Sequence, residues 1–545
     1  MFPGLMQDEP LTLRTVVDRA SSLFATKTIT TRQGDGFVTQ TFGETVQRAR
    51  RLAGALSARG IGDGDRVATF AMNTARHVEL YVAVPVMGAV LHTLNPRLAP
   101  GQISYIANHA ADRIVFADES LRGAWTAVEG LEPVDDVIWM DDQGTGIADG
   151  LDYEDLLAEA TPLPAEWPRL DERQAAAMCY TSGTTGNPKG VVYSHRSATL
   201  HSLGSLFADT LAISERDVVM PIVPQFHANA WGTIYAALMA GASLAMPSLH
   251  MDPESITRLV EEAGVTMSAA VPTVWFGVLE AVRSGQIDPA RLSTLERIAC
   301  GGSAVPEGLM RGFDELGIRI VHAWGMTETS PLGTVATVKS TIPADDEMRT
   351  RLTQGIVMPP LRVRVVTEDG SVADWDGETM GELEISGPWI ADAYYDPEQP
   401  DGRGGQESFA TDPDGTRWLR TGDVAVIDAE GYVRLTDRMK DLVKSGGEWI
   451  STVDLENHLI GHPKVAEAAV IAVPHPRWDE RPVACVVKAD ESLTAEELLD
   501  HAAERFAKWQ LPDEIIFIDE VPKTSVGKFD KKVLRSRFAD HQLPS

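Results

Sequence analysis

Apolar positions between residues 40 and 290 follow two spacings in alternation. Helical spacing fits Phe42–Ala58 and 73–86, while short uninterrupted apolar runs occupy Arg66–Phe70 and 113–117. Helices that alternate with short apolar strands are typical of βαβ units, in which helices cover a parallel sheet. This part of the chain is therefore predicted to form an α/β domain with parallel sheets.

The pattern changes after about residue 360. Short apolar segments broken by Gly and Asp predict a small β-rich subdomain, with strands at 362–367, Gly381–Ser386, 423–427 and 432–435. The segment 396–415 is rich in Gly, Asp and Pro, so we expect a mobile loop there.

The C-terminal part carries the pattern of a compact α+β unit, with strands at 466–473, 481–488 and 514–518 and a helix at 494–509. The whole chain is thus predicted to be α/β, with a large N-terminal domain of βαβ-type sheets, a small β-rich subdomain and a small mobile α+β C-terminal domain. A chain of 545 residues is too long for one hydrophobic core. The predicted divisions are 1–437, a hinge at 438–440, and 441–545.

The charge balance restricts the partners. The formal net charge is −31 at pH 7, and a nucleic-acid partner would require a basic face. Nucleic acid is therefore not an expected partner. Any site for an anion must be locally basic, and the candidate cations are Lys189, Lys444, Lys528 and Arg438.

The cysteine and hydropathy patterns bear on disulfides, on zinc sites and on whether the chain crosses a membrane. Cys179, Cys300 and Cys485 are far apart and form no C-x-x-C pair, which excludes a disulfide framework and disfavours a zinc site. The longest uninterrupted apolar run, 80–91, is shorter than the roughly 20 residues that cross a bilayer. The N-terminus also lacks a basic segment followed by an apolar core. We expect a cytoplasmic protein with no transmembrane segment.

Residues 181–190 read TSGTTGNPKG and lie between two strand-like apolar runs. Glycine lets backbone N–H groups approach a ligand, and successive N–H groups, hydroxyls and a lysine can hold a polyphosphate. A stretch of this composition alone is more often a solvent-exposed turn. Because Lys189 is followed by Gly190 and no helix opens there, the stretch differs from the common mononucleotide-binding loop.

This stretch resembles the phosphate-binding motif of the adenylate-forming superfamily, which includes acyl-CoA synthetases, peptide-synthetase adenylation domains and beetle luciferases. Five further motifs follow in the order of that family: GGSAVP at 301–306, AWGMTETSP at 323–331, WLRTGD at 418–423, DRMKDLVKSGGE at 437–448 and PKTSVGK at 522–528. The MTETSP wording and PQFHANAW at 224–231 are most similar to the medium- or long-chain fatty acyl-CoA synthetase branch. The resemblance covers nearly the whole chain.

The resemblance implies a site for ATP built from several motifs. Lys189 and the loop hydroxyls would hold the β- and γ-phosphates, and Asp423 would accept both ribose hydroxyls. Trp324 stands where the family usually carries Tyr, and either ring can stack on adenine. The implied nucleotide-contacting set is Thr181, Ser182, Gly183, Thr184, Thr185, Gly186, Lys189, Gly302, Ser303, Trp324, Gly325, Met326, Thr327, Asp423 and Arg438.

Magnesium is the expected cation. A carboxylate in a phosphate site is explained by a bound cation, so Glu328 is the candidate Mg²⁺ ligand rather than a glutamate on a helix surface, with Thr184 beside it. The resemblance places the co-substrate coenzyme A near Lys444, Gly446 and Gly447.

The acid side of the site is less defined. His227 and Trp231 lie four residues apart and would share a face if this segment were helical. Core packing of a large aromatic is a competing explanation for Trp231. The resemblance implies that Trp231 gates an acyl tunnel and that His227 lines the meeting point of acid and thiol. His195 is expected to be structural.

The reaction that the resemblance implies has two steps. The acid carboxylate attacks the α-phosphate of Mg-ATP and expels pyrophosphate, with Lys528, Thr327 and Lys189 positioning and neutralising charge. The small domain then turns about Lys440, and the thiol of coenzyme A attacks the acyl-adenylate to give acyl-CoA and AMP. The expected activity is that of an AMP-forming acid–thiol ligase, acting on a fatty acid.

Other readings stay open at this point. An enzyme of the same kind could load a separate carrier protein or activate an aryl acid, since the sequence names neither the acid nor its acceptor. A degenerate nucleotide-binding protein is disfavoured by the intact set of Lys189, Glu328, Asp423 and Lys528. A hydrolase is disfavoured because no G-x-S-x-G elbow occurs. The sequence is compatible with a homodimer.

Overall fold

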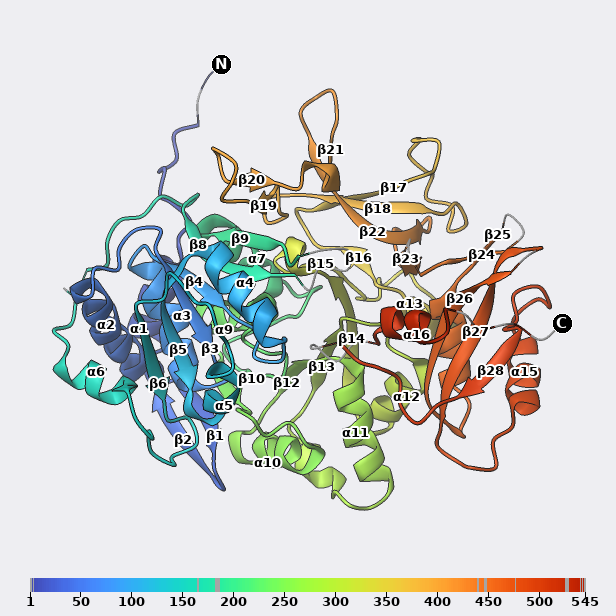
Figure 1. Cartoon of the computed structure of the whole chain (residues 1–545), viewed down its shortest axis with the longest axis horizontal. Helices are drawn as coiled ribbons and strands as arrows, with labels where there is room; N and C mark the ends of the chain where they lie inside the picture. Colours follow the sequence, from blue (N-terminus) through green and yellow to red (C-terminus); the bar gives the residue numbers. More distant parts are fainter. Residues whose placement is uncertain are drawn as a thin grey trace.

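The computed structural model describes residues 2, 4–163, 166–181, 187–438, 441–445, 448–475, 477–524, 529–539, 541 and 543. Figure 1 shows the chain running from the N-terminal sheets at the left to the C-terminal unit at the right, with the β-rich subdomain above. No helix within these residues is long and apolar enough to cross a bilayer.

Two nine-stranded sheets form most of the N-terminal part. The first sheet contains, in spatial order, β16 (Ile356–Val357), β15 (Leu332–Val335), β14 (Arg319–Gly325), β13 (Arg297–Gly301), β12 (Met267–Ala270), β10 (Val218–Pro221), β11 (Ser243–Met246), β1 (Thr28–Gln33) and β2 (Gly36–Thr41). The second contains β20 (Arg403–Gly404), β19 (Tyr394–Tyr395), β9 (Gly190–Ser194), β8 (Ala175–Tyr180), β4 (Val90–Thr93), β3 (Arg66–Phe70), β5 (Asp112–Asp118), β6 (Asp136–Met140) and β7 (Leu151–Asp152). Their central strands are parallel, which confirms the predicted α/β class.

Helices connect and cover these strands. Their bounds are α1 Leu13–Leu23, α2 Phe42–Ala58, α3 Ala75–Val86, α4 Pro100–Ala110, α5 Arg122–Trp125, α6 Tyr153–Glu159, α7 His195–Ser205, α8 Ala228–Trp231, α9 Thr233–Ala240, α10 Pro253–Ala263, α11 Pro272–Arg283, α12 Glu307–Glu315 and α13 Glu347–Arg351. Helix α2 begins at a capping box, in which Thr41 and Glu44 satisfy each other's backbone N–H groups. Helix α3 is buried on nearly every side, as its largely apolar sequence allows.

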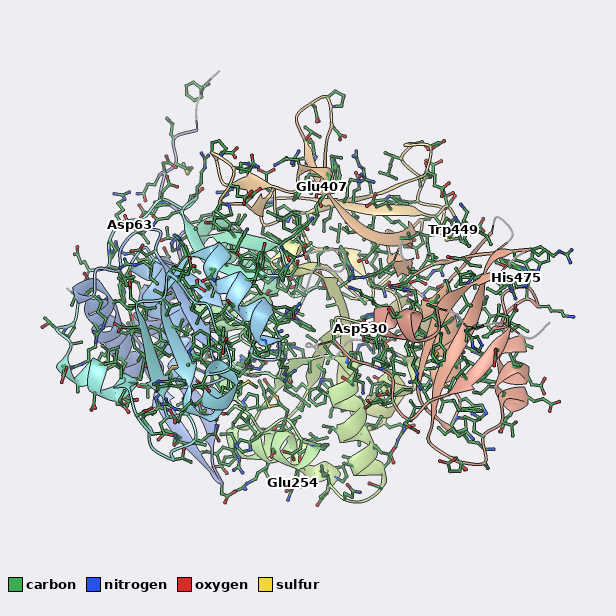
Figure 2. All side chains as sticks on the ribbon, in the orientation of Figure 1. Asp63, Glu254, Glu407, Trp449, His475 and Asp530 are labelled. Carbon is green, nitrogen blue, oxygen red and sulfur yellow. The ribbon has the colours of Figure 1, made fainter. Side chains whose placement is uncertain are left out.

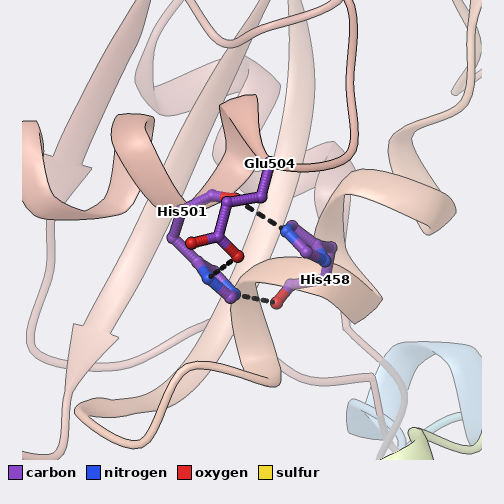
Figure 3. A group of neighbouring side chains, drawn as sticks. All are labelled: His458, His501 and Glu504. Carbon is purple, nitrogen blue, oxygen red and sulfur yellow. Dashed lines mark hydrogen bonds and ion pairs between the residues drawn. The ribbon is translucent and has the colours of Figure 1, made fainter.

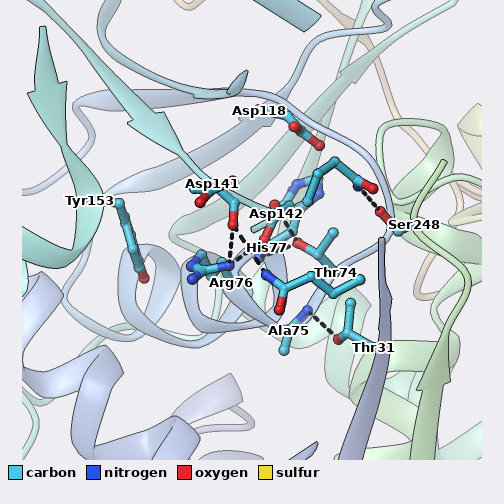
Figure 4. Close-up of polar contacts among 12 residues, drawn as sticks. Thr31, Thr74, Ala75, Arg76, His77, Asp118, Asp141, Asp142, Tyr153 and Ser248 are labelled. Carbon is cyan, nitrogen blue, oxygen red and sulfur yellow. Dashed lines mark hydrogen bonds and ion pairs between the residues drawn. The ribbon is translucent and has the colours of Figure 1, made fainter. Parts of the chain in front are cut away.

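Polar contacts join the two sheets at one end of their parallel strands. Figure 4 shows part of this network around Arg76, whose guanidinium donates to Asp142 (2.9 Å). The Asn73 side chain reaches into the other sheet and donates to the carbonyl oxygens of Pro221 (2.6 Å) and Val223 (2.9 Å). These buried contacts fix the position of one sheet relative to the other.

The β-rich subdomain is a five-stranded antiparallel sheet, composed of β17 (Arg362–Val366), β18 (Gly381–Ser386), β22 (Arg417–Ile427), β21 (Phe409–Thr411) and β23 (Val433–Arg438). The segment 396–415, predicted as a loop, contains the short strands β20 and β21. Strand β20 forms because Arg403 and Gly404 pair with Tyr395 and Tyr394. Its mobility stays a prediction.

The C-terminal unit has its own core and a second five-stranded sheet, with β25 (Glu448–Ile450), β24 (Val443–Ser445), β27 (Asp479–Lys488), β26 (Val465–His475), β28 (Glu514–Phe517), α14 (Thr452–Ile460), α15 (Ala495–Ala503) and α16 (Lys531–Arg537). The helix predicted at 494–509 ends at Ala503, so its predicted length was wrong. Phe506 and Leu511 instead turn back and pack on the core of this unit.

A buried ionic cluster joins the end of β23 to the C-terminal unit. The Asp437 carboxylate accepts from the backbone N–H of Thr452 (2.7 Å) at the start of α14. The Lys531 ammonium lies 2.7 Å from Glu456 and also contacts the Thr452 hydroxyl at 2.5 Å. Asp437, Thr452 and Glu456 are all buried. The predicted hinge at 438–440 adjoins this cluster, and the predicted divisions of the chain remain a proposal.

Burial and charge act in opposite directions in this cluster. Burial raises the pKa of Glu456 to about 7, although Lys531 lowers it in part. Burial also lowers the pKa of Lys531, but attraction from Glu456 and Asp437 outweighs burial and raises that pKa above its usual value. The ammonium therefore stays charged, and it is the partner that makes the buried carboxylates tolerable.

We expect Lys531→Met to destabilise the C-terminal unit by about 3–5 kcal/mol, because a buried carboxylate loses its cation. The loss should grow with rising pH, since folded Glu456 would hold a proton that the unfolded chain releases. The matched control is the double variant Glu456→Gln/Lys531→Met, which keeps an oxygen for the Val470 N–H (2.6 Å). Scanning calorimetry, with hydrogen exchange in α14 and β26, should show recovery in the double variant. Equal melting of Lys531→Met and wild type would contradict the cluster's role.

Candidate nucleotide and acyl site

The motif at 323–331 is held between strands from distant parts of the chain. Its short 3₁₀ turn, Thr327–Thr329, follows β14. The Tyr193 hydroxyl of β9 donates to the backbone oxygen of Thr327 (2.8 Å), and the Tyr394 hydroxyl of β19 donates to Glu328 Oε1 (2.6 Å). Two tyrosines on neighbouring strands therefore fix the backbone and the carboxylate of this motif.

Glu328 is a buried carboxylate, with only 5% of the residue exposed. Burial raises its pKa, while the Tyr394 hydroxyl and the charges of Arg438 and Lys189 lower it in part. The expectation that it is not an ordinary surface glutamate is therefore correct. A hard carboxylate oxygen beside two cations and a phosphate-type loop fits a Mg²⁺ ligand, because Mg²⁺ prefers such oxygens.

Lys189 lies at the end of the predicted phosphate loop. Its ammonium is 4.6 Å from the ring centre of Tyr394 and 3.3 Å from Glu407 Oε1. Both partners of this ion pair are partly exposed, so the pair contributes little stability. The backbone N–H of Thr181 donates to the Lys189 oxygen (2.9 Å), which closes the two ends of the loop. Figure 2 labels Glu407 on the β-rich subdomain.

Asp423 brings three motifs together. Its Oδ2 accepts from the indole N–H of Trp324 (2.9 Å), and its Oδ1 lies 3.2 Å from Arg438 Nε. The Trp324 ring packs on the backbone of Gly333, where an added Cβ would lie 2.6 Å from Cζ3. Trp324 therefore orients the carboxylate that the resemblance assigns to ribose. The sequence pattern did not predict the hydrogen bond between Trp324 and Asp423.

The acid-side segment is not the helix that the spacing suggested. Ala228, Asn229, Ala230 and Trp231 all have positive φ, between 44° and 55°, and form one left-handed turn. The condition under which His227 and Trp231 would share a face of a right-handed helix is therefore not met. Left-handed backbone costs about 1–2 kcal/mol for each L-residue.

A side chain of strand β8 and one of helix α9 hold this strained turn. The Cys179 thiol donates to Asn229 Oδ1 (3.2 Å), and the Thr233 hydroxyl donates to the Ala230 oxygen (2.6 Å). Gly232 follows with φ of 71° and donates its N–H to the Asn229 oxygen (2.9 Å). Strain that is over-determined by its neighbours is typical of functional segments.

Trp231 meets the motif at 301–306. A Cβ at Gly301 would lie 3.7 Å from Trp231 Cη2 and only 2.2 Å from the backbone oxygen of Ala323. Glycine is required there because β14 runs so close. Gly302 has φ of 82° and Ser303 is exposed beside it. The acid-side motif and the motif at 301–306 are thus neighbours, and Trp231 is buried where they meet.

The predicted coenzyme A side lies on the C-terminal unit. The Lys444 ammonium is 5.0 Å from the ring centre of Trp449, and its backbone N–H donates to Glu480 Oε2 (2.9 Å). Figure 2 labels Trp449 at the edge of this unit. The predicted residues Ser182, Gly183, Thr184, Thr185, Gly186, Lys440, Gly446, Gly447 and Lys528 lie outside the described part of the chain.

The structure also places the two histidines that the sequence analysis discussed. His195 is buried, and its Nδ1 accepts from the Leu13 N–H (3.4 Å), as expected for a structural residue. His227 is half-buried beside the left-handed turn. Sequence reasoning missed Tyr193, Tyr394 and Glu407, because only tertiary structure brings them to the motifs.

Comparison with known proteins agrees with this geometry. Residues 17–395 match the AMP-binding enzyme family, and residues 454–528 match the AMP-binding enzyme C-terminal domain. The chain is 46% identical to a long-chain-fatty-acid–CoA ligase of Thermus thermophilus, across 99% of this chain and 98% of that protein. It is 42% identical to a 3-methylmercaptopropionyl-CoA ligase of Ruegeria lacuscaerulensis, across 98% and 99%.

A solved structure of an ATP-bound protein has a similar fold. ATP-bound MatB from Rhodopseudomonas palustris superimposes with a TM-score of 0.82 at 26% identity, covering 97% of this chain and 99% of that one. Family model, sequence and fold agree along nearly the full length. The chain belongs to the AMP-binding enzyme family, the adenylate-forming superfamily, and within it to the fatty acyl-CoA synthetase branch.

Proposed function

We propose that this AMP-forming acyl-CoA ligase activates a fatty acid through an acyl-adenylate formed beside Glu328 and Asp423. One observation carries the proposal. Tyr394 binds buried Glu328 (2.6 Å) and lies 4.6 Å from the Lys189 ammonium, and Arg438 lies 3.2 Å from Asp423, so groups from three separate parts of the chain meet around one carboxylate. Such an arrangement of cations and a buried carboxylate suits a nucleotide triphosphate with its metal.

In the first step the acid carboxylate attacks the α-phosphate of ATP, and pyrophosphate leaves. Lys189 binds phosphate oxygens, and Asp423, held by Trp324 and Arg438, accepts the ribose hydroxyls. Thr327 lies beside the α-phosphate and Lys528 approaches from the C-terminal unit. Glu328 would hold Mg²⁺, which neutralises phosphate charge when bound.

In the second step the C-terminal unit turns about Lys440. The pantetheine arm of coenzyme A enters near Lys444, Gly446 and Gly447, and its thiol attacks the acyl carbonyl. The new C–S bond replaces the bond to AMP, which leaves with the electron pair, and His227 lies where acid and thiol meet. Two half-reactions need different groups at one site, and a domain rotation supplies them in turn.

The acid is proposed to be a fatty acid because the Thermus relative is named for long-chain fatty acids. The Ruegeria relative is named for a short thioether acid, so chain length must be measured. The decisive experiment is pyrophosphate release over acids of graded length, with and without coenzyme A, followed by product analysis. Acyl-CoA from an alkanoic acid supports the proposal. A preference for benzoate-type acids, or transfer only to a carrier protein, would favour the alternative.

Glu328→Gln should raise the Mg²⁺ concentration needed for half-maximal pyrophosphate release by about tenfold or more. The amide can still accept from Tyr394 but lacks the charge that a hard cation prefers. Thioester formation from supplied acyl-adenylate should be unchanged. Superimposable Mg²⁺ titrations of wild type and variant would show that Glu328 is not a metal ligand.

Tyr394→Phe tests the same carboxylate through its pKa. The Tyr394 hydroxyl lowers the pKa of Glu328, so its removal should raise that pKa further above the usual value. Adenylation needs the ionised form, and the acidic limb of its pH profile should therefore move to higher pH. Glu328→Gln serves as the control, because a glutamine at this position cannot titrate and so contributes no acidic limb to the pH profile. An acidic limb that is unchanged in Tyr394→Phe would show that ionisation of Glu328 does not control turnover.

Trp231→Ala should change the preferred acid chain length while the KM for ATP stays nearly constant, because Trp231 packs on Gly301 and not on Asp423. Truncating a buried Trp costs about 3–5 kcal/mol, so folding is checked first by circular dichroism. Trp231→Phe provides a milder truncation. If both folded variants keep the wild-type acid profile, Trp231 is core packing and not a gate.

Lys528→Ala should lower the adenylation rate by about 10²–10³-fold, as expected for the loss of one group that stabilises charge in the transition state. Thioester formation from supplied acyl-adenylate should be spared. Lys523→Ala is the matched control, because Lys523 lies in the same segment and pairs with Glu467. Equal losses in both half-reactions would contradict the proposal that the rotation of the C-terminal unit brings different residues to the site in each half-reaction.

A further inference from the structure

Histidine side chains join elements that are distant in the sequence. Figure 3 shows one example, His458 of α14 and His501 of α15, whose rings stack with centroids 4.2 Å apart. Each Nε2 donates to the backbone oxygen of the other residue, at 2.8 and 3.1 Å. These contacts tie two helices of the C-terminal unit together. His109 of α4 makes a contact of another kind, because its partner directly precedes the motif at 181–190.

The His109 ring is bonded to Tyr180, the last residue of β8. Its Nδ1 lies 2.7 Å from the Tyr180 hydroxyl, and the two rings meet edge to face with centroids 5.8 Å apart. Burial is the main cause that lowers the pKa of His109, although Asp396 and Glu398 oppose this effect, and burial raises the pKa of Tyr180. Both groups are therefore neutral near pH 7, and a neutral imidazole and a phenol can form one hydrogen bond.

The Tyr180 ring lies across Gly190, which ends the same motif. A Cβ at Gly190 would lie 3.0 Å from Tyr180 Cζ and 3.2 Å from Tyr395 Cβ, so glycine leaves room for both tyrosines. Strand pairing brings these three residues together, since Gly190 pairs with Tyr180 of β8 and with Tyr395 of β19. The His109 ring also meets the Tyr395 ring edge on, with centroids 5.6 Å apart. One imidazole therefore contacts both of the tyrosines that enclose Gly190.

Lys189 lies directly beside this cluster. Its backbone oxygen accepts from the N–H of Thr181, the residue that follows Tyr180, at 2.9 Å. Its ammonium lies 4.6 Å from the ring centre of Tyr394, the neighbour of Tyr395 on β19. The backbone of Lys189 is thus held next to Tyr180, and its ammonium lies against the strand that carries Tyr395. A shift of Tyr180 would therefore move the ammonium that is proposed to bind phosphate.

We propose that His109 is a positioning residue for the phosphates of ATP. It acts through the Tyr180 hydroxyl, which fixes the backbone next to Lys189 and thereby the place of the ammonium. The inference rests on the proposed function, in which Lys189 binds phosphate oxygens. Phosphoryl transfer depends mainly on positioning and on neutralised charge, so a small displacement of this cation weakens the hold on the triphosphate. AMP lacks the β- and γ-phosphates, and its binding should not depend on His109.

The test is calorimetric titration of the full chain with Mg-ATP and, separately, with AMP, in the absence of acid. Tyr180→Phe keeps the ring over Gly190 and removes only the hydroxyl, while His109→Phe keeps an aromatic ring and removes the nitrogen. Each variant should lower the affinity for ATP by about threefold to tenfold, the range for the loss of one neutral hydrogen bond. The affinity for AMP should stay unchanged. The double variant should be no weaker than either single variant, because both changes remove the same bond.

Tyr105→Phe is the matched control. Its ring contacts His109 from the same helix, with centroids 5.3 Å apart, and the substitution leaves the bond to Tyr180 in place. It should bind both nucleotides as wild type does. Unchanged ATP affinity in Tyr180→Phe, equal losses of ATP and AMP affinity, or additive losses in the double variant would each overturn the inference. If His109→Phe does not fold, the ratio of ATP to AMP affinity in Tyr180→Phe decides.

Pyrophosphate release by the wild type separates this inference from the proposed function. If the wild type binds ATP but releases no pyrophosphate with any acid, the proposed function fails, while the comparison of ATP with AMP still tests His109. If the wild type makes acyl-CoA and the variants keep their ATP affinity, only the positioning role of His109 fails. A wild type that binds no ATP would contradict both.

Discussion

The nucleotide site depends on one buried carboxylate. Burying Glu328 is costly unless hydrogen bonds and positive charge compensate, and the fold supplies both through Tyr394 and through Arg438 and Lys189. These partners come from the second sheet, the β-rich subdomain and the phosphate loop. Keeping Glu328 buried thus requires that all three parts meet at one point, which is where the reaction is proposed to occur.

Much of this arrangement could be predicted from the sequence. Short uninterrupted apolar runs that alternate with helical patterns indicated the parallel sheets, and the ordered motifs indicated which residues belong to the nucleotide site. Residues such as Tyr193 and Tyr394 could not be found in this way, because their role arises from pairing of strands far apart in the chain. The helix predicted at 494–509 was too long because tertiary packing of Phe506 outweighs local propensity.

The left-handed turn at Ala228–Trp231 shows a different limit. No local pattern predicts four L-residues with positive φ, since each is unfavourable by itself. The turn exists because Asn229 is held by the Cys179 thiol and because Gly232 continues it without strain. The strained backbone is held by contacts with Cys179 of β8 and Thr233 of α9, so a change in the packing of these buried residues would also change the geometry of the acid-side motif.

The contact between Lys189 and Glu407 has a consequence for how nucleotide is admitted. Glu407 acts as a built-in competitor, because its carboxylate lies near the ammonium expected to bind phosphate. An incoming triphosphate must displace it, and a weak, exposed pair is easily displaced. Once released, Glu407 no longer ties its segment of the β-rich subdomain to the loop. If Lys189 binds the triphosphate as proposed, binding would therefore change a contact between the loop and the β-rich subdomain.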